Sequence, residues 1–198
     1  MRERVFIPAE GLRRWLGRLA DQPGVRGGAI LSTCNRTEIY ACVEDGTTGL
    51  DELTSALDPL GEWAAHRFQR RGSAAIQHLF RVASGMDSAI LGEGQVLGQF
   101  KVAQRVAREA GTLDPDLDFV MRRAITAAKR VRSETGIGRN PVGFGHAAVA
   151  QARTVLGSLE GRSALLVGAG KMAGATARLL GDGGLARVFF STRTPARA

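Results

Sequence analysis

Residues typical of secreted, metal-binding and membrane proteins are scarce in this sequence. Its 198 residues include two cysteines, three histidines and six prolines. Two cysteines make no disulfide framework, so we expect a cytoplasmic protein in a reducing compartment. The histidines and cysteines lack the spacing of metal ligands, which predicts no metal site. No apolar run reaches the roughly 20 residues of a membrane span and no signal-peptide pattern opens the chain, so we expect no membrane partner.

Aromatic and acidic residues are also few. Aromatics make up 6% of the chain, so the sequence shows no obvious platform for stacking nucleic-acid bases. The 27 basic residues outnumber the 19 acidic ones, which gives a net charge of +8 at pH 7. This excess favours a polyanionic partner such as nucleic acid, and a solvated, arginine-rich surface is the alternative. The apolar share of 44% suits one large globular domain or two small ones.

Apolar residues recur at helical spacing in several segments. The pattern predicts helices over 9–20, 73–84, 116–134 and 145–157, and another that starts at Val96. Residues 28–44 are typical of a strand, a polar turn and a second strand. The side chains expected to face inward on the helix over 73–84 are Ile76, Leu79, Phe80 and Ala83. The outer face of 116–134 carries Arg122, Arg123, Lys129, Arg130 and Arg132, which form either a solvated surface or a phosphate contact.

Two glycine-rich stretches interrupt these patterns. Residues 84–99 carry four glycines with polar side chains between them, at Ser88, Glu93, Gln95 and Gln99. Glycine costs about 1 kcal/mol in a helix interior relative to alanine, so this stretch is not one simple helix. Close approach of the backbone to a ligand is one reason for such glycines. Residues 136–145 are also rich in glycine and contain a proline, which marks a candidate domain boundary.

A dinucleotide-binding pattern lies near the end of the chain. An apolar strand leads into Gly168, Ala169, Gly170, Lys171, Met172 and Ala173, a G-x-G-x-x-A pattern that opens a helix and precedes a second strand. Gly168 permits a tight turn, Gly170 lets a pyrophosphate approach the backbone, and Ala173 keeps the helix close to the strand. A tight turn without a ligand is the alternative.

The second strand ends in hydroxyl and arginine side chains. Ser191, Arg193 and Thr194 stand where an NAD site usually places an acidic residue. Such a cluster suits a 2′-phosphate, so we expect NADPH rather than NAD. The alternative is that Arg193 faces water.

The polar turn around Cys34 is the candidate site for covalent chemistry. Cys34 lies among Thr33, Asn35 and Arg36, and a nearby arginine stabilises a thiolate. The alternative is a core cysteine, which is the usual environment of a lone cysteine. Cys42 lies inside a strand pattern, so we interpret it as structural. His78 neighbours apolar residues, and taken alone it is a half-buried histidine.

Four segments in this order resemble the glutamyl-tRNA reductase family across the whole chain. They are "STCNRTEIY", "HLFRVASGMDSAILGEGQVLGQ", "SETGIGRNPV" and "LLVGAGKMA". The family reduces glutamyl-tRNA to glutamate-1-semialdehyde with NADPH, the first step of tetrapyrrole and haem biosynthesis. The resemblance implies an α/β protein. Residues 1–140 would be a ferredoxin-like α+β catalytic domain with appended helices. Residues 141–198 would be a connecting helix and a partial Rossmann NADPH-binding unit.

The resemblance also implies roles for single residues. Cys34 matches the nucleophile that forms a thioester, and His78 matches a histidine important for activity as a general acid or base. Arg36 would hold the glutamate side-chain carboxylate and Glu93 the α-ammonium group. The full set of implied substrate contacts is Thr33, Asn35, Arg36, Ser88, Glu93, Gly94, Gln95 and Gln99. The implied NADPH contacts are Gly168, Ala169, Gly170, Lys171, Met172, Ala173, Ser191, Arg193 and Thr194.

The chain departs from the family pattern in several places. The family's first strand is expected to be missing before "MRERVFIPAEGL", which would expose a sheet edge. Gly94 stands where the family commonly has proline, and Gly143 and His146 stand where it commonly has serine. Family members form homodimers through a domain that we expect to be absent here, and the downstream aminomutase is a candidate partner. The alternative is a truncated or diverged paralogue that only binds an aminoacyl-tRNA or reduces a different one.

Overall fold

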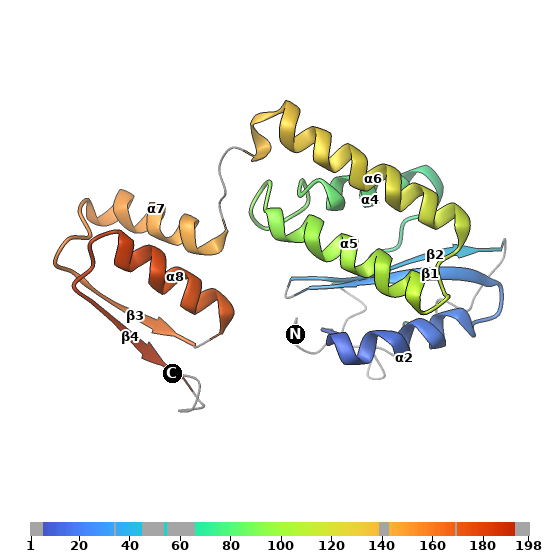
Figure 1. Cartoon of the computed structure of the whole chain (residues 1–198), viewed down its shortest axis with the longest axis horizontal. Helices are drawn as coiled ribbons and strands as arrows, with labels where there is room; N and C mark the ends of the chain where they lie inside the picture. The colour runs from blue at the N-terminus through green and yellow to red at the C-terminus, as the bar shows by residue number, and fades with distance from the viewer. Residues whose placement is uncertain are drawn as a thin grey trace. The chain divides into compact units, whose positions relative to one another are not determined.

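The computed structural model describes residues 6–33, 35–44, 54, 66–138, 143–168 and 170–192, with the backbone alone for Phe144 and Lys171. The chain divides into two compact units, Met1–Gly138 and Arg139–Ala198. Helices and strands occur in both, which confirms the α/β class (Figure 1).

The first unit places helices around a two-stranded sheet. Strands β1 (Val25–Ser32) and β2 (Thr37–Val43) are antiparallel. Helices α2 (Ala9–Ala20) and α5 (Gly94–Glu109) both contact β1, and Figure 1 shows them on opposite sides of the sheet. Helix α6 (Pro115–Glu134) packs against α4 (Gly72–Ala83), α5 and the short 3-10 helix η2 (Gly136–Gly138).

Strand β1 runs through the centre of the core. Its residues Ala29, Ile30 and Leu31 are at most 2% exposed, because α2 and α5 cover the two faces of the strand. The N–H of Gly28 points away from β2 and donates to the carbonyl of Thr112 at 2.7 Å. The sheet edge that we expected to be exposed is therefore covered by Thr112 at this point.

The predicted helices are present, with two corrections at single residues. Ile76, expected to face inward, is 46% exposed, because Leu79, Val82 and Ala83 form the buried face of α4. Arg132, expected on the outer face of α6, is half-buried and donates to the carbonyl of Gly92 at 2.9 Å. The prediction that 84–99 is not one helix is confirmed, since turns cover 84–92 and α5 begins at Gly94.

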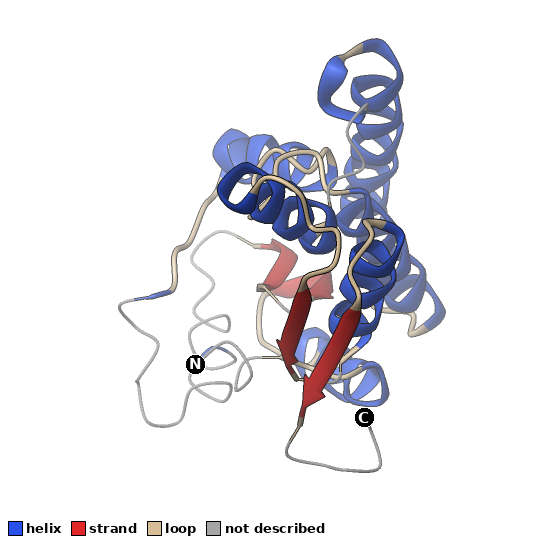
Figure 2. Ribbon diagram, turned by 90° about the vertical axis from the view of Figure 1, so that its left-hand side faces the viewer, coloured by secondary structure: helices blue, strands red, loops and turns tan. Residues whose placement is uncertain are grey.

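The second unit contains two parallel strands and two helices. Its elements are α7 (Phe144–Leu156), β3 (Ser163–Val167), α8 (Lys171–Asp182) and β4 (Arg187–Ser191). Strands β3 and β4 run side by side in the same direction, as the two strands nearest the viewer of Figure 2 show. Val149, Leu159 and Leu180 form a small core between the helices and the strands. Among the described helices of both units, none is long and apolar enough to cross a bilayer.

A candidate active site around His78

The polar turn between β1 and β2 is closed by the side chain of Thr33. The Thr33 hydroxyl oxygen accepts hydrogen bonds from the N–H groups of Asn35 at 3.2 Å and Arg36 at 3.1 Å. The Thr33 N–H donates to the carbonyl of Arg36 at 2.8 Å. Thr33 is only 7% exposed, so its hydroxyl shapes the turn from inside. Cys34 lies outside the described residues, but Thr33 and Asn35 on either side of it are described.

Alternation along β2 brings Arg36, Glu38 and Tyr40 together. The Arg36 Nη1 atom donates to Glu38 Oε1 at 2.9 Å, and the Tyr40 hydroxyl donates to Glu38 Oε2. Burial, together with the charge of Glu38, raises the pKa of Tyr40 well above its ordinary value. Tyr40 therefore stays a neutral donor, and Glu38 is an acceptor shared by several groups.

His78 of α4 lies between two carboxylates. Its Nε2 atom is 3.1 Å from Glu38 Oε2, and its Nδ1 atom is 3.2 Å from Asp87 Oδ2. An ionised carboxylate only accepts hydrogen bonds, so both contacts are satisfied when the ring carries a proton on each nitrogen. The His78 side chain is 12% exposed, which shields these contacts from water. The two contacts hold the imidazole of His78 at a fixed place beside the polar turn.

Asp87 connects three parts of this cluster. Its carboxylate accepts from Arg81 Nη2 at 2.7 Å and from Arg81 Nε at 3.0 Å, and its backbone carbonyl accepts from Arg36. The hydrogen bond from Arg81 lowers the pKa of Asp87 and outweighs the opposite effect of burial. Asp87 is therefore ionised at neutral pH and faces both His78 and Arg81.

Sequence reasoning missed Glu38 and Asp87. The period-two alternation of β2 could have found Glu38, because it lies two residues from both Arg36 and Tyr40. Asp87 lies in the glycine-rich stretch that was singled out, but only the fold shows that its carboxylate reaches His78.

The remaining predicted substrate residues lie in the turn after α4 and in the first turns of α5. Ser88 and Glu93 are half-buried in the turn, Gly94 and Gln95 are exposed at the start of α5, and Gln99 is half-buried. The structure shows no side-chain hydrogen bond from Ser88, Glu93, Gln95 or Gln99 to another residue that it describes. Among the predicted site residues, it therefore links Arg36 to His78 through their shared partners Glu38 and Asp87, but it does not link these four side chains to them.

A polar hollow opens beside His78. It has a volume of about 320 Å³ and is lined by Arg70, Ala74, Gln77, His78, Arg81 and Asp87. Within the described stretches, no group of three histidine, cysteine or acidic side chains could hold a metal ion.

The second cysteine, Cys42, is not a candidate nucleophile. Burial raises the pKa of its thiol, with a hydrogen bond to Asp114 as the next cause, so Cys42 is no thiolate at neutral pH.

The G-x-G-x-x-A loop in the second unit leaves its backbone open. Gly168 has φ of +106°, which other residues rarely adopt, and its N–H donates to the carbonyl of Ser191 at 2.7 Å. Gly170 is the N-cap of α8, and a Cβ added there would meet no atom within 4 Å. Met172 is exposed and Ala173 half-buried in the first turn of α8. Ala169, Arg193 and Thr194 lie outside the described residues.

Comparison with known proteins decides the family. The family model described as glutamyl-tRNAGlu reductase, N-terminal domain, matches residues 1–135. This chain belongs to the glutamyl-tRNA reductase family. The resemblance stated from the sequence motifs is thereby confirmed.

Curated relatives and a solved structure agree with this assignment. Over its full length the chain is 42% identical to glutamyl-tRNA reductase of Desulforudis audaxviator and 44% identical to that of Pelotomaculum thermopropionicum. It covers 45% and 46% of those two proteins, so it spans about half the length of its glutamyl-tRNA reductase relatives. The structure of glutamyl-tRNA reductase from Methanopyrus kandleri is 38% identical, with a TM-score of 0.60, and the match covers 100% of this chain and 48% of that one.

Proposed function

We propose that the protein acts in the NADPH-dependent reduction of glutamyl-tRNA to glutamate-1-semialdehyde, the first step of tetrapyrrole biosynthesis. The observation that carries this proposal is His78, held between Glu38 and Asp87 beside the turn that contains Cys34. Family membership supports the same conclusion.

The first chemical step is transfer of the glutamyl group to sulfur. The Cys34 thiolate attacks the carbonyl carbon of the aminoacyl ester, so that a carbon–sulfur bond forms and the bond to the ribose oxygen breaks. The leaving ribose oxygen takes a proton, and His78 is the donor that the family resemblance implies. For this transfer, one ring N–H of His78 exchanges its carboxylate acceptor, Glu38 or Asp87, for the ribose oxygen. The products are a thioester on Cys34 and deacylated tRNA.

The polar residues around the turn bind the glutamyl group. Arg36 holds the side-chain carboxylate of glutamate, which then shares the guanidinium with Glu38. Glu93 binds the α-ammonium group. The other proposed substrate contacts are Thr33, Asn35, Ser88, Gly94, Gln95 and Gln99. An arginine at position 36 favours an acidic aminoacyl group, and family membership does not favour the alternatives of a binding module or a reductase of another aminoacyl-tRNA.

The loop at the start of α8 fits NADPH. Gly168 and Gly170 present bare backbone at a helix N-terminus, the arrangement that binds a pyrophosphate. When bound, NADPH supplies the hydride that reduces the thioester to an aldehyde. The proposed contacts are Gly168, Ala169, Gly170, Lys171, Met172, Ala173 and Ser191, with Arg193 and Thr194 at the 2′-phosphate.

The finer fold and the cellular setting belong to the same proposal. Residues 1–140 form a ferredoxin-like catalytic domain with appended helices. Residues 141–198 form a connecting helix and a partial Rossmann unit, which the parallel strands β3 and β4 support. The protein is cytoplasmic, glutamyl-tRNA is its substrate, the downstream aminomutase is a candidate partner, and the family's homodimer is the expected assembly.

Release of tRNA in a single turnover tests this function. The chain is mixed with a smaller amount of glutamyl-tRNA in the absence of NADPH, and deacylated tRNA is measured over time. We expect faster release than from buffer alone, no acceleration by Cys34→Ser, and wild-type rates from the control Cys42→Ser. Equal rates for wild type and Cys34→Ser would rule out the proposed nucleophile.

A further inference from the structure

An exposed aromatic ring lies against His78. Phe68 precedes α4 and is 63% exposed, although large apolar side chains usually gain stability by burial. Its ring centroid is 5.2 Å from that of the His78 imidazole, with an angle of 86° between the planes. The edge-to-face contact fixes the ring beside the candidate proton donor and leaves much of its surface open.

A guanidinium group lies over the same ring. The Arg70 Cζ atom is 5.0 Å from the centroid of the Phe68 ring, a cation–π contact. Arg70 forms no ion pair with a carboxylate in the part of the chain that the structure describes, whereas Arg81 is bound by Asp87. Arg70 therefore keeps its charge available at the rim of the hollow beside His78.

The hollow joins this surface to the reacting groups. Arg70 and His78 both line it, and Gln77 adds a side-chain amide that can donate to and accept from a base edge. An aromatic face next to an arginine plane is the usual surface on which single-stranded nucleic acids stack their bases. An apolar ligand would leave Arg70 without an anionic partner, so the chemistry of the hollow favours a nucleotide.

The proposed reaction places a base in this area. The ester that Cys34 attacks is attached to the ribose of the terminal nucleotide. His78 donates its proton to that ribose oxygen, so the base on the same ribose lies within one sugar's width of His78. The ring of Phe68 lies against His78, and Phe68 remains 63% exposed.

We propose that Phe68 and Arg70 form a stacking site for the terminal base of the aminoacyl-RNA substrate. The inference rests on the proposed function and deepens it, because it assigns recognition of the nucleotide to residues that no sequence motif had pointed to. Phe68 and Arg70 are binding residues here, and the proton transfer remains with His78.

Two small probes distinguish binding of the base from binding of the amino acid. One is a stable amide analogue of 3′-glutamyl-adenosine, and the other is the α-methylamide of glutamate, which lacks the nucleoside. Dissociation constants are measured for the whole chain by calorimetry. We expect wild type to bind the nucleoside probe more tightly than the methylamide. Phe68→Leu should weaken binding of the nucleoside probe by roughly tenfold or more, the usual effect of losing one base stack. Binding of the methylamide stays unchanged.

Two further variants control for folding and for chemistry. Phe68→Tyr keeps an aromatic face and retains binding. Phe119→Leu makes the same change at another exposed phenylalanine, which is 52% exposed and has Arg123 5.1 Å above its ring, but does not line the hollow. This control keeps wild-type binding.

The possible failures are distinguishable. If wild type binds glutamyl-tRNA but Phe68→Leu binds the nucleoside probe as well as wild type does, the stacking site is wrong and the proposed function stands. If wild type binds neither glutamyl-tRNA nor either probe, the stacking site and the proposed function are both wrong.

Discussion

Asp114 is the N-cap of helix α6, and its carboxylate also contacts Arg26 of strand β1. It accepts from the N–H groups of Asp116 at 2.8 Å and Leu117 at 3.3 Å, and it lies 3.5 Å from Arg26 Nε. Asp114 is 7% exposed, so water does not replace these partners easily. Glu38 and Asp87 likewise position His78 through their carboxylates, since each gives one ring nitrogen an acceptor.

Replacing Asp114 tests its role as the N-cap of α6. Asp114→Ala is expected to lower the free energy of unfolding by about 1–2 kcal/mol at pH 7, because two N–H groups of the helix lose their acceptor. Urea denaturation followed by circular dichroism measures the change. A loss below about 0.3 kcal/mol would contradict this role.

The charge of Asp114 also makes stability depend on pH. Burial acts to raise its pKa, but hydrogen bonds from Cys42 and from the N–H groups of Asp116 and Leu117 lower it overall. The folded pKa lies below the unfolded value of about 3.9, so the stabilisation is present above that pH and is lost as the pH falls through the folded pKa. The difference in stability between wild type and Asp114→Asn should therefore shrink from about pH 5 to about pH 3.

Asp87→Asn tests whether the acceptor at Nδ1 positions His78. We expect single-turnover release of tRNA to slow by about tenfold or more, a part of the 10²–10⁴-fold that a general acid contributes. Glutamyl-tRNA binding and the unfolding midpoint should change little. The matched control is Glu134→Gln, since Glu134 also pairs with an arginine but on the surface of α6. Equal rates for both variants would show that Asp87 has no positioning role.

The turn between α4 and α5 is held in place by η2 and α6. Gly92 has φ of +78°, and a Cβ there would lie 2.2 Å from the carbonyl oxygen of Ile137. Arg132 donates to the Gly92 carbonyl. These contacts fix residues 84–93, which include Asp87 and Ser88, and so they set the position of the candidate site.

Gly92→Ala measures how tightly the turn is packed. The left-handed backbone and the clash with Ile137 together predict a loss of about 2–4 kcal/mol in the free energy of unfolding. Gly111→Ala is the matched control, because Gly111 has φ of +71° but open space around its Cβ. Gly111→Ala should lower the free energy of unfolding only by the cost of the left-handed backbone, about 1–2 kcal/mol. Equal losses would mean that η2 does not constrain the turn.

The helices and the polar turn could be predicted from sequence because their signals are local. Periodicity located α2 and α6 within one residue at each end. The predicted buried face of α4 was wrong at Ile76. Only the elements that pack against a helix decide which of two adjacent rows of apolar side chains is covered. The His78 cluster could not be predicted, because Glu38 and His78 lie 40 residues apart and meet only through the register of β2 and the position of α4.

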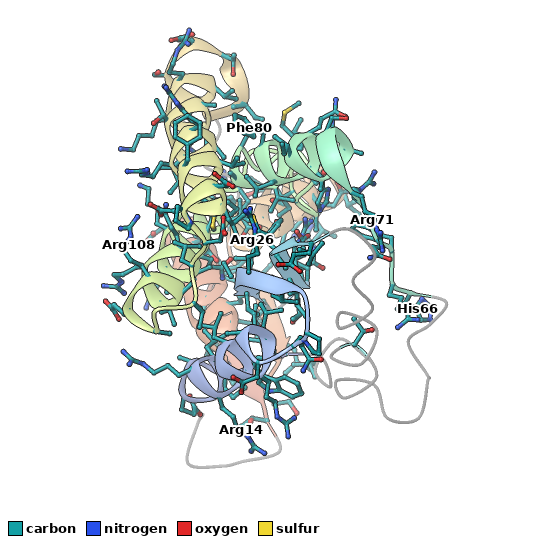
Figure 3. All side chains as sticks on the ribbon, turned by 90° about the vertical axis from the view of Figure 1, so that its right-hand side faces the viewer. Arg14, Arg26, His66, Arg71, Phe80 and Arg108 are labelled. Carbon is teal, nitrogen blue, oxygen red and sulfur yellow. The ribbon has the colours of Figure 1, made fainter. Side chains whose placement is uncertain are left out.

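The whole chain combines a basic surface with two separately folded units. The net charge is +8, and Figure 3 shows the labelled Arg14, Arg71 and Arg108 pointing outward from different segments of the first unit. Spread over several elements, these charges suit a polyanion, and the proposed function makes that polyanion a tRNA. The second unit carries the G-x-G-x-x-A loop, our proposed dinucleotide site, on its own strand–helix–strand framework.

Gly170→Val tests the cofactor role of the second unit. The structure leaves space around a Cβ at Gly170, so the fold should tolerate the side chain, but a pyrophosphate could no longer approach the backbone. We expect NADPH binding, followed by fluorescence titration, to weaken at least tenfold while the unfolding midpoint stays within a few degrees. Unchanged NADPH affinity would remove this loop from the cofactor site.

The most direct test of the account is to find the glutamyl group on the protein. The chain is incubated with radiolabelled glutamyl-tRNA without NADPH, quenched in acid, digested and analysed by mass spectrometry. The account predicts one glutamyl group in thioester linkage on the peptide that contains Cys34, and a much reduced yield for His78→Asn. An unlabelled wild-type chain, or a label that persists in Cys34→Ser, would contradict it.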